Sequence, residues 1–125
     1  MVLGCPGCDK SISVSHVPGG NPAVAMFADK YVRSWRTCAQ CKHVRCDDCL
    51  RKQRGLFRQA TCDCGGTFSA EANDYWYIRV GEAEGMGADT AVFMGRLSVM
   101  SRAEAAMEMR RAGYPSSMLK RFGLE

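Results

Sequence analysis

Eight cysteines stand out in this sequence, because thiolates at close spacing bind metal ions. They fall into four close pairs along the chain: Cys5 and Cys8, Cys38 and Cys41, Cys46 and Cys49, and Cys62 and Cys64. A C-x-x-C pair can bring two sulfurs to one metal ion at the Zn–S distance of about 2.3 Å, and two pairs complete a closed tetrahedral site. Four pairs therefore predict two structural zinc ions.

Other uses of paired cysteines fit the sequence less well. An even number of cysteines permits a disulfide framework. However, the sequence begins without a basic stretch followed by an apolar one, so we expect no secretory signal and a reducing compartment, where disulfides are rare. A thioredoxin-like redox motif needs only one C-x-x-C pair, and the spacings do not follow those of ferredoxin clusters. A single iron ion held by four thiolates stays open, because its ligands would be the same.

The distances between the pairs predict which cysteines share an ion. Only four residues separate Cys41 from Cys46, which leaves little chain to wrap the two middle pairs around one ion. An interleaved arrangement, with the first pair joined to the third and the second to the fourth, avoids this problem. We therefore expect one zinc ion at Cys5, Cys8, Cys46 and Cys49, and the other at Cys38, Cys41, Cys62 and Cys64.

The residues around the third pair predict a short helix that carries two of these ligands. Asp47 and Asp48 suit the start of a helix, because the helix dipole favours negative charge there. Residues 50–57 continue at helical spacing. We therefore expect Cys46 and Cys49 at the N-terminal end of a helix.

The last pair, Cys62-x-Cys64, is one residue shorter than the others. The two glycines at positions 65 and 66 would let the chain bend tightly enough for both sulfurs to bind one ion. If they do not, His43 or a water molecule completes the second site.

The order of the pairs resembles that of the cross-brace, or treble-clef, zinc fingers. The pattern C-x2-C, a long gap, C-x2-C-x4-C-x2-C and a final pair over residues 5–66 is most similar to FYVE and FYVE-related domains, with RING and PHD fingers as more distant relatives. The resemblance covers about half of the chain. It implies a small α+β zinc-binding fold, a two-zinc cross-brace module with short β-hairpins and a helix.

The resemblance also implies two possible functions, and each depends on signature residues that can be compared with this sequence. FYVE domains that bind phosphatidylinositol 3-phosphate carry paired histidines in a basic signature near the third cysteine. Residues 35–42 here include Arg36 and Lys42 but no histidine, so we do not expect a phosphoinositide membrane as partner. RING ubiquitin ligases usually have a histidine ligand and a proline within the last pair, where this chain has Asp63. A RING-like ubiquitin ligase component is one alternative function.

Basic residues gather around the middle cysteines. Residues 36–58 hold seven Lys or Arg against two Asp, a net charge of +5, whereas the whole chain carries +4. Such a stretch is typical of proteins that bind phosphate groups, and a nucleic-acid-binding zinc-finger protein is the other alternative function. Its contacts would be Arg36, Lys42, Arg45, Arg51, Lys52, Arg54 and Arg58. Two zinc ions held by eight thiolates would add a net charge of −4, so part of the positive charge would balance the metal sites.

Short strands are predicted around and after the first three pairs. Residues 12–17 alternate in polarity, which predicts a half-exposed strand and places His16 at the surface. Residues 23–35 could form a strand or a short helix whose apolar side chains cover the zinc sites. Residues 67–69 and 75–80 are rich in types that favour sheets.

The last third of the sequence predicts helices. Residues 81–87 are small and acidic, which favours a loop or linker, and residues 89–122 follow a helical pattern in which Ser101 begins a capping box. We therefore expect two domains, the two-zinc module at 1–80 and a helical segment at 81–125.

No catalytic arrangement of residues is visible in the sequence. If all eight cysteines bind zinc, neither a thiol nucleophile nor an open metal position remains. We therefore expect a non-enzymatic adaptor or assembly protein, without a small-molecule substrate, that binds a protein partner through its C-terminal helices. No apolar stretch reaches the ~20 residues of a membrane span, and we expect a cytoplasmic or nuclear location.

Overall fold

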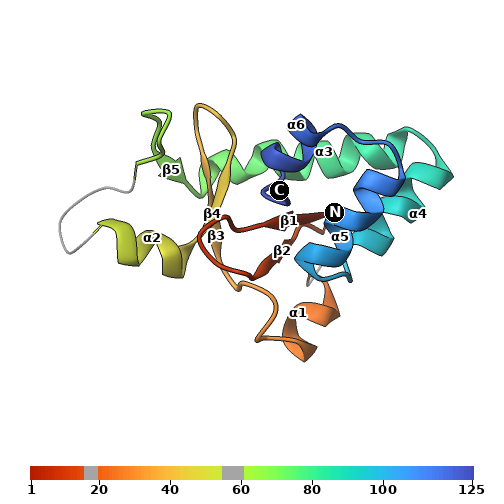
Figure 1. The fold of residues 1–125 in the computed structure, drawn as a ribbon, viewed down its shortest axis with the longest axis horizontal. Coiled ribbons are helices and arrows are strands. Elements are labelled where there is room, and N and C mark those ends of the chain that lie inside the picture. The colour runs from red at the N-terminus through yellow and green to blue at the C-terminus, as the bar shows by residue number, and fades with distance from the viewer. Residues whose placement is uncertain (16–19, 55–60) are drawn as a thin grey trace.

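Two β-hairpins lie near the centre of the molecule, with helices around them (Figure 1). The computed structural model describes residues 1–15, 20–54 and 61–125. The strands are β1 (Val2–Gly4), β2 (Ser11–Ser13), β3 (Trp35–Cys38), β4 (Val44–Cys46) and β5 (Phe68–Ser69). β1 pairs with β2, and β3 lies between β4 and β5, all in antiparallel orientation. These short strands and the surrounding helices fit the expected small α+β fold.

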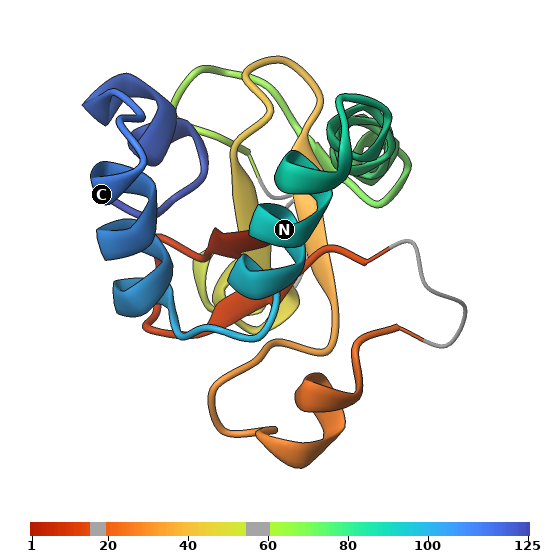
Figure 2. The same cartoon turned by 90° about the vertical axis from the view of Figure 1, so that its right-hand side faces the viewer.

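Most of the remaining described residues are helical. The helices are α1 (Pro22–Met26), α2 (Asp47–Arg54), the 3-10 turn η1 (Glu71–Asn73), α3 (Asp74–Gly85), α4 (Ala88–Leu97), α5 (Arg102–Arg111) and α6 (Ser116–Arg121). Figure 2 shows α3 on one side of the hairpins, α5 and α6 on the other side, and α4 between them in front. Within the described residues, no helix is both long and apolar enough to cross a membrane.

Residues 75–80 form a helix, and the strand predicted for them is wrong. Their aromatic and β-branched types favour sheets, but within α3 the side chains of Trp76, Val80 and Ala83 recur at helical spacing and are all buried. Burial of this stripe outweighs local propensity, which determines structure only weakly. The predicted loop at 81–87 is also largely helical, because α3 continues to its end at Gly85.

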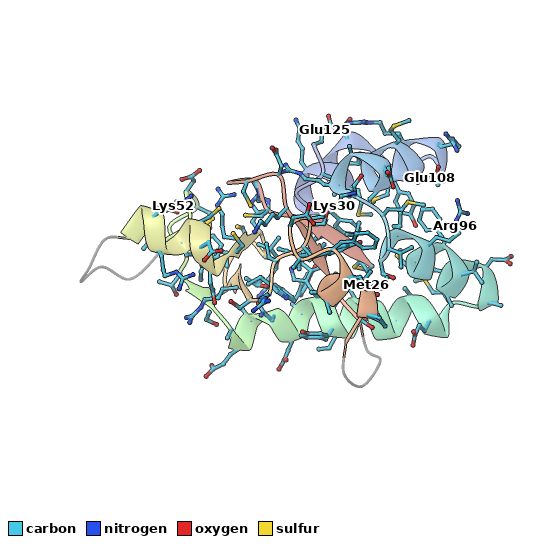
Figure 3. All side chains as sticks on the ribbon, turned by 90° about the horizontal axis from the view of Figure 1, so that it is seen from below. Met26, Lys30, Lys52, Arg96, Glu108 and Glu125 are labelled. Atoms are coloured by element: carbon cyan, nitrogen blue, oxygen red, sulfur yellow. The ribbon has the colours of Figure 1, made fainter. Side chains whose placement is uncertain are left out.

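The sequence of residues 23–35 is compatible with a strand or a short helix, and the structure contains a helix and the start of a strand there. α1 occupies its first residues and β3 begins at its end. Tyr31, Val32 and Trp35 are buried, whereas the Met26 side chain on α1 is exposed (Figure 3). Only the second half of this stretch therefore contributes to the core.

The helices of the C-terminal segment lie where the sequence predicts them. Ser101 caps α5, because its hydroxyl accepts a hydrogen bond from the Glu104 backbone N–H at 3.3 Å. Arg96 on α4 pairs with Glu108 on α5 at 3.0 Å (Figure 3). Gly113 has a φ of +92° and lets the chain turn from α5 toward α6.

One hydrophobic cluster contains residues from both parts of the chain. It includes Leu3 and Ile12 from the first hairpin and Leu97, Met109 and Leu119 from the last three helices. The boundary predicted at residue 80 falls inside α3. That the two sides fold as separate domains stays a prediction.

The end of the chain contacts the first strand at a place that requires glycine. The Gly4 N–H donates to the Phe122 carbonyl at 2.8 Å. A β-carbon on Gly123 would overlap the Gly4 carbonyl oxygen, and Gly123 has a φ of +72°. Both the space and the left-handed backbone therefore require glycine at position 123.

We predict that Gly123→Ala lowers the free energy of unfolding by about 2 kcal/mol or more, because the methyl group meets the Gly4 carbonyl and the backbone is left-handed. Gly95→Ala is the matched control, since Gly95 lies within α4 with open space around it. The control should raise the free energy of unfolding by about 0.5–1 kcal/mol. Urea unfolding of both variants in the presence of zinc measures these changes, and equal effects would contradict the predicted contact.

Candidate metal centres

The eight cysteines lie in two groups of four. We call Cys5, Cys8, Cys46 and Cys49 site 1, and Cys38, Cys41, Cys62 and Cys64 site 2. Within each site, all four sulfurs lie within 4.8 Å of one another. These are the two sets expected from the spacing, so the structure joins the first pair to the third and the second pair to the fourth.

Site 1 is built from a hairpin turn and a helix N-terminus. Cys5 and Cys8 lie in the connection between β1 and β2, where the Cys8 N–H donates to the Cys5 carbonyl at 3.2 Å. Cys46 ends β4, and Cys49 lies in the first turn of α2. The positive end of the α2 dipole stabilises negative charge on these last two sulfurs.

Site 2 is built from the β3–β4 turn and the segment before β5. The short pair Cys62-x-Cys64 supplies both of its sulfurs, because the chain bends there: Gly65 has a φ of +91° and its N–H donates to the Cys62 carbonyl at 2.9 Å. A β-carbon on Gly66 would lie 2.7 Å from the Cys38 sulfur. His43 is exposed and is not a member of the group. Because the bend at the two glycines lets both Cys62 and Cys64 join the group, site 2 needs no histidine ligand.

The sulfur geometry fits a tetrahedral zinc ion. A regular tetrahedron with Zn–S distances of about 2.3 Å has sulfur–sulfur edges of about 3.8 Å. In site 1 the Cys5–Cys49 and Cys8–Cys46 sulfur distances are 3.7 and 3.8 Å. In site 2 the corresponding distances are 3.4 Å for Cys38–Cys64 and 3.5 Å for Cys41–Cys62. All are much longer than a disulfide bond of about 2.05 Å, and each group could hold one zinc ion.

Backbone N–H groups point at several of the sulfurs. The Cys46 N–H donates to the Cys5 sulfur at 3.3 Å, and the Cys49 N–H donates to the Cys46 sulfur at 3.4 Å. In site 2 the Cys41 N–H donates to the Cys38 sulfur at 3.4 Å. Such bonds stabilise the thiolate form that a metal ion requires, and they orient the ligands.

The thiols of site 2 differ in acidity when no metal is bound. Burial raises the pKa of Cys41 to about 12 and also raises the pKa of Cys62. Burial acts in the same direction on Cys38, but hydrogen bonds from the Cys41 and Gln40 backbones outweigh it and bring the pKa of Cys38 to about 7. A metal ion binds thiolates, so loading site 2 must displace the protons of the less acidic thiols.

Arg102 supports site 1, and sequence analysis did not identify it. This first residue of α5 donates from its guanidinium to the carbonyl oxygens of Cys5 and Cys8, at 2.7 Å in each case. Four thiolates around a divalent ion leave a net charge of −2, which a neighbouring cation stabilises. Arg102 lies 94 residues beyond Cys8 in the sequence, so no local pattern could have revealed this contact.

Two of the basic residues proposed as phosphate contacts have acidic partners in the described part of the chain. Arg36 pairs with Asp47 at 3.2 Å, and Arg51 pairs with Asp48. Arg45 lies opposite Arg36 in the β3–β4 ladder. The two aspartates at the start of α2 therefore offset the charge of Arg36 and Arg51.

The other basic residues of this set lie elsewhere. Lys52 is exposed on α2, at the end of the molecule far from α4 and α5 (Figure 3). The Lys42 ammonium group lies 5.5 Å from the centre of the Tyr75 ring. Arg58 and the side chain of Arg54 lie outside the described residues.

None of the known family models matches this sequence, and neither a characterised protein nor a solved structure matches it. The assignment of the two metal sites therefore depends on the chemistry and geometry of the cysteines themselves.

We predict that Arg102→Gln weakens metal binding at site 1 by about tenfold and leaves site 2 unchanged, because it removes the charged support of the turn that carries Cys5 and Cys8. Cadmium-113 NMR of the cadmium-loaded protein, with a competing chelator, reports on each site separately. Arg111→Gln is the control, since Arg111 lies on the same helix and pairs with Glu108. Equal cadmium loss from both sites of the Arg102 variant would show that Arg102 does not act specifically on site 1.

We also predict that the zinc affinity of site 2 falls as the pH falls. Above neutral pH the metal-free site still holds protons on Cys41 and Cys62, whose pKa values are raised. For each proton that zinc displaces, the zinc affinity falls about tenfold when the pH falls by one unit. Two displaced protons therefore give a drop in zinc affinity of at least about a hundredfold from pH 8 to pH 7. Chelator competition at several pH values measures the slope, and a slope below two protons per zinc ion would contradict this account.

Proposed function

We propose that this chain is a non-enzymatic adaptor protein in which two zinc ions, each held by four cysteine thiolates, stabilise the fold. The observation that carries the proposal is that each sulfur group supplies four ligands. A tetrahedral zinc ion with four protein ligands has no open position for water or substrate, so its role is structural. The two ions would be structural cofactors.

We further infer that the two-zinc part is a cross-brace zinc finger of the treble-clef type. In support, one hairpin turn supplies Cys5 and Cys8, a second hairpin follows, and the first turn of α2 supplies Cys49. The alternation of the two sites along the chain is the cross-brace arrangement. We propose a likeness to FYVE and RING domains for the scaffold alone, and we do not extend it to their lipid-binding or ligase activity.

The C-terminal helices and the turns beside them are the proposed docking surface for a protein partner. Large apolar side chains are exposed there, with Met86 at 76% and Val92 at 62% of full exposure. The Met107 side chain on α5 is exposed as well. Flexible methionine side chains adapt to irregular apolar surfaces, which suits a docking role. We expect the adaptor to work inside the cell, where a reducing compartment keeps the thiols available for zinc.

Zinc content and partner capture test the proposal together. Native mass spectrometry of the reduced protein should show two zinc ions per chain. Wild-type protein and the double variant Met86→Glu and Val92→Glu are then used to capture partners from the source cells, with quantification by mass spectrometry. We expect a partner that the double variant recovers at least tenfold less.

Met26→Glu is the matched control for the capture experiment. Met26 is 75% exposed but lies on α1, outside the C-terminal helices, so this variant should recover the partner at the wild-type level. A zinc content other than two per chain would contradict the structural part of the proposal. Equal recovery by the wild type and the double variant would contradict docking on the C-terminal helices.

A further inference from the structure

Three cationic side chains surround the ring of Tyr75. The distances to the ring centre are 4.6 Å from the Arg79 guanidinium, 5.3 Å from the Arg121 guanidinium and 5.5 Å from the Lys42 ammonium group. They come from α3, from the end of α6 and from the turn between β3 and β4. We call these four residues the Tyr75 cluster. Like charges repel, and the negative face of one ring compensates only part of that repulsion.

Buried contacts of Trp76 hold the cluster together. Trp76 is only 1% exposed, and its Nε1–H donates to the Lys42 carbonyl at 3.1 Å. Its ring also packs edge-on against Phe122, with ring centres 5.3 Å apart. Trp76 therefore fixes both the turn that carries Lys42 and the end of the helix that carries Arg121. The cations meet because the core places them there, so the cluster is organised before any ligand arrives.

The backbone at Lys42 is unfavourable for a lysine. Its φ is +69°, and it is the sole non-glycine residue with a positive φ in the described part of the chain. Glycine adopts this left-handed conformation without the steric cost that a side chain imposes. The turn between β3 and β4 sets this conformation: the Lys42 N–H donates to the Cys38 carbonyl at 3.0 Å, and the Lys42 ammonium donates to the Ala39 carbonyl at 2.7 Å.

Acidic groups offset little of the cluster's charge. Glu82 pairs with Arg79 at 3.2 Å, whereas Lys42 and Arg121 have no acidic partner among the residues that the structure describes. The side chains of the cluster and Glu82 therefore carry a formal charge of +2. When zinc is bound, the thiolates of site 2, of which Cys41 precedes Lys42, offset part of the lysine's charge. In addition, the Arg79 Nε is buried without a hydrogen-bond partner.

The cluster also offers a neutral hydrogen-bond donor. The Tyr75 hydroxyl accepts a hydrogen bond from Arg121. Its own proton remains to be donated, since no acceptor for it is recorded among the described residues. Charged and neutral donors are thus gathered within reach of one ring.

We propose that the Tyr75 cluster binds a phosphate monoester, of the kind that a phosphorylated side chain of a protein partner presents. At pH 7 such a group carries a charge of about −1.5 to −2 and three strong acceptor oxygens. This charge complements the formal +2 of the cluster, and guanidinium and ammonium groups are the donors that bind phosphate best. The assignment of the phosphate to a protein partner rests on the proposed adaptor function. The ability of the cluster to bind a phosphate group rests only on its own side chains.

A nucleic-acid backbone fits the cluster less well. It presents a row of singly charged diesters and needs a continuous series of free cations. Two of the basic residues on β3 and α2 that could extend the series, Arg36 and Arg51, are paired with acids, whereas Lys52 is exposed on α2. A discrete dianion is therefore the ligand that the charge distribution favours.

NMR titration of the full, zinc-loaded and isotope-labelled chain tests this site. The probes are N-acetyl-phosphoserine amide, its unphosphorylated counterpart, inorganic phosphate and a short single-stranded oligonucleotide. We expect saturable shifts of the Lys42, Tyr75, Arg79 and Arg121 signals with the phosphorylated probe and none with the unphosphorylated one.

Lys42→Gly is the decisive variant, because glycine accepts the left-handed backbone and the fold should persist. It should weaken binding of the phosphorylated probe roughly tenfold, the loss expected for one charged hydrogen-bond donor. Lys120→Gln is the matched control: Lys120 precedes Arg121 on α6 and is exposed, and its loss removes the same charge outside the cluster. Binding by this control should equal that of the wild type.

The outcomes separate the possible sources of the phosphate. Tighter binding of the phosphoserine probe than of inorganic phosphate supports a phosphorylated protein, and equal binding supports the site but assigns it to free phosphate. Absence of saturable shifts, or equal losses in Lys42→Gly and Lys120→Gln, would overturn the site. Tighter and strongly salt-dependent binding of the oligonucleotide would also overturn it. None of these results alters the partner-capture comparison, so failure here is distinguishable from failure of the adaptor proposal.

Discussion

Two groups of four sulfurs bring together distant parts of the chain, and the short strands and turns of this protein are arranged around them. Site 1 joins residue 5 to residue 49, and site 2 joins residue 38 to residue 64. The strands between them have only two to four residues, and such short pairings are not stable on their own in water. Metal–thiolate bonds can offset the entropy of closing these loops, because metal binding and folding are then one process.

The β3–β4 hairpin belongs to both sites. Cys38 at the end of β3 is a member of site 2, whereas Cys46 at the end of β4 is a member of site 1. A shift in the pairing of these strands would therefore disturb both sulfur groups at once. The interleaved order of the cysteines is thus also a constraint on strand register, and register is otherwise weakly specified in such short strands.

The C-terminal helices are part of this architecture rather than an addition to it. Arg102 on α5 holds the turn of site 1 through two carbonyl groups, and Gly123 brings the end of the chain against β1. The Nε1–H of Trp76 on α3 donates to the Lys42 carbonyl, which lies in the β3–β4 turn beside site 2. Both metal-site turns are therefore supported by helices from later in the chain.

Local spacing determined the parts of this protein that the sequence alone predicts. The number of sulfur groups and their membership follow from pair spacing. The helix that begins at Asp47 follows from its acidic first turn, and the start of α5 follows from the capping residue Ser101. The remaining features depend on packing: α3 is a helix because burial of Trp76 outweighs strand propensity. The Arg102 contact and the Tyr75 cluster likewise join residues far apart in sequence, and only packing brings them together.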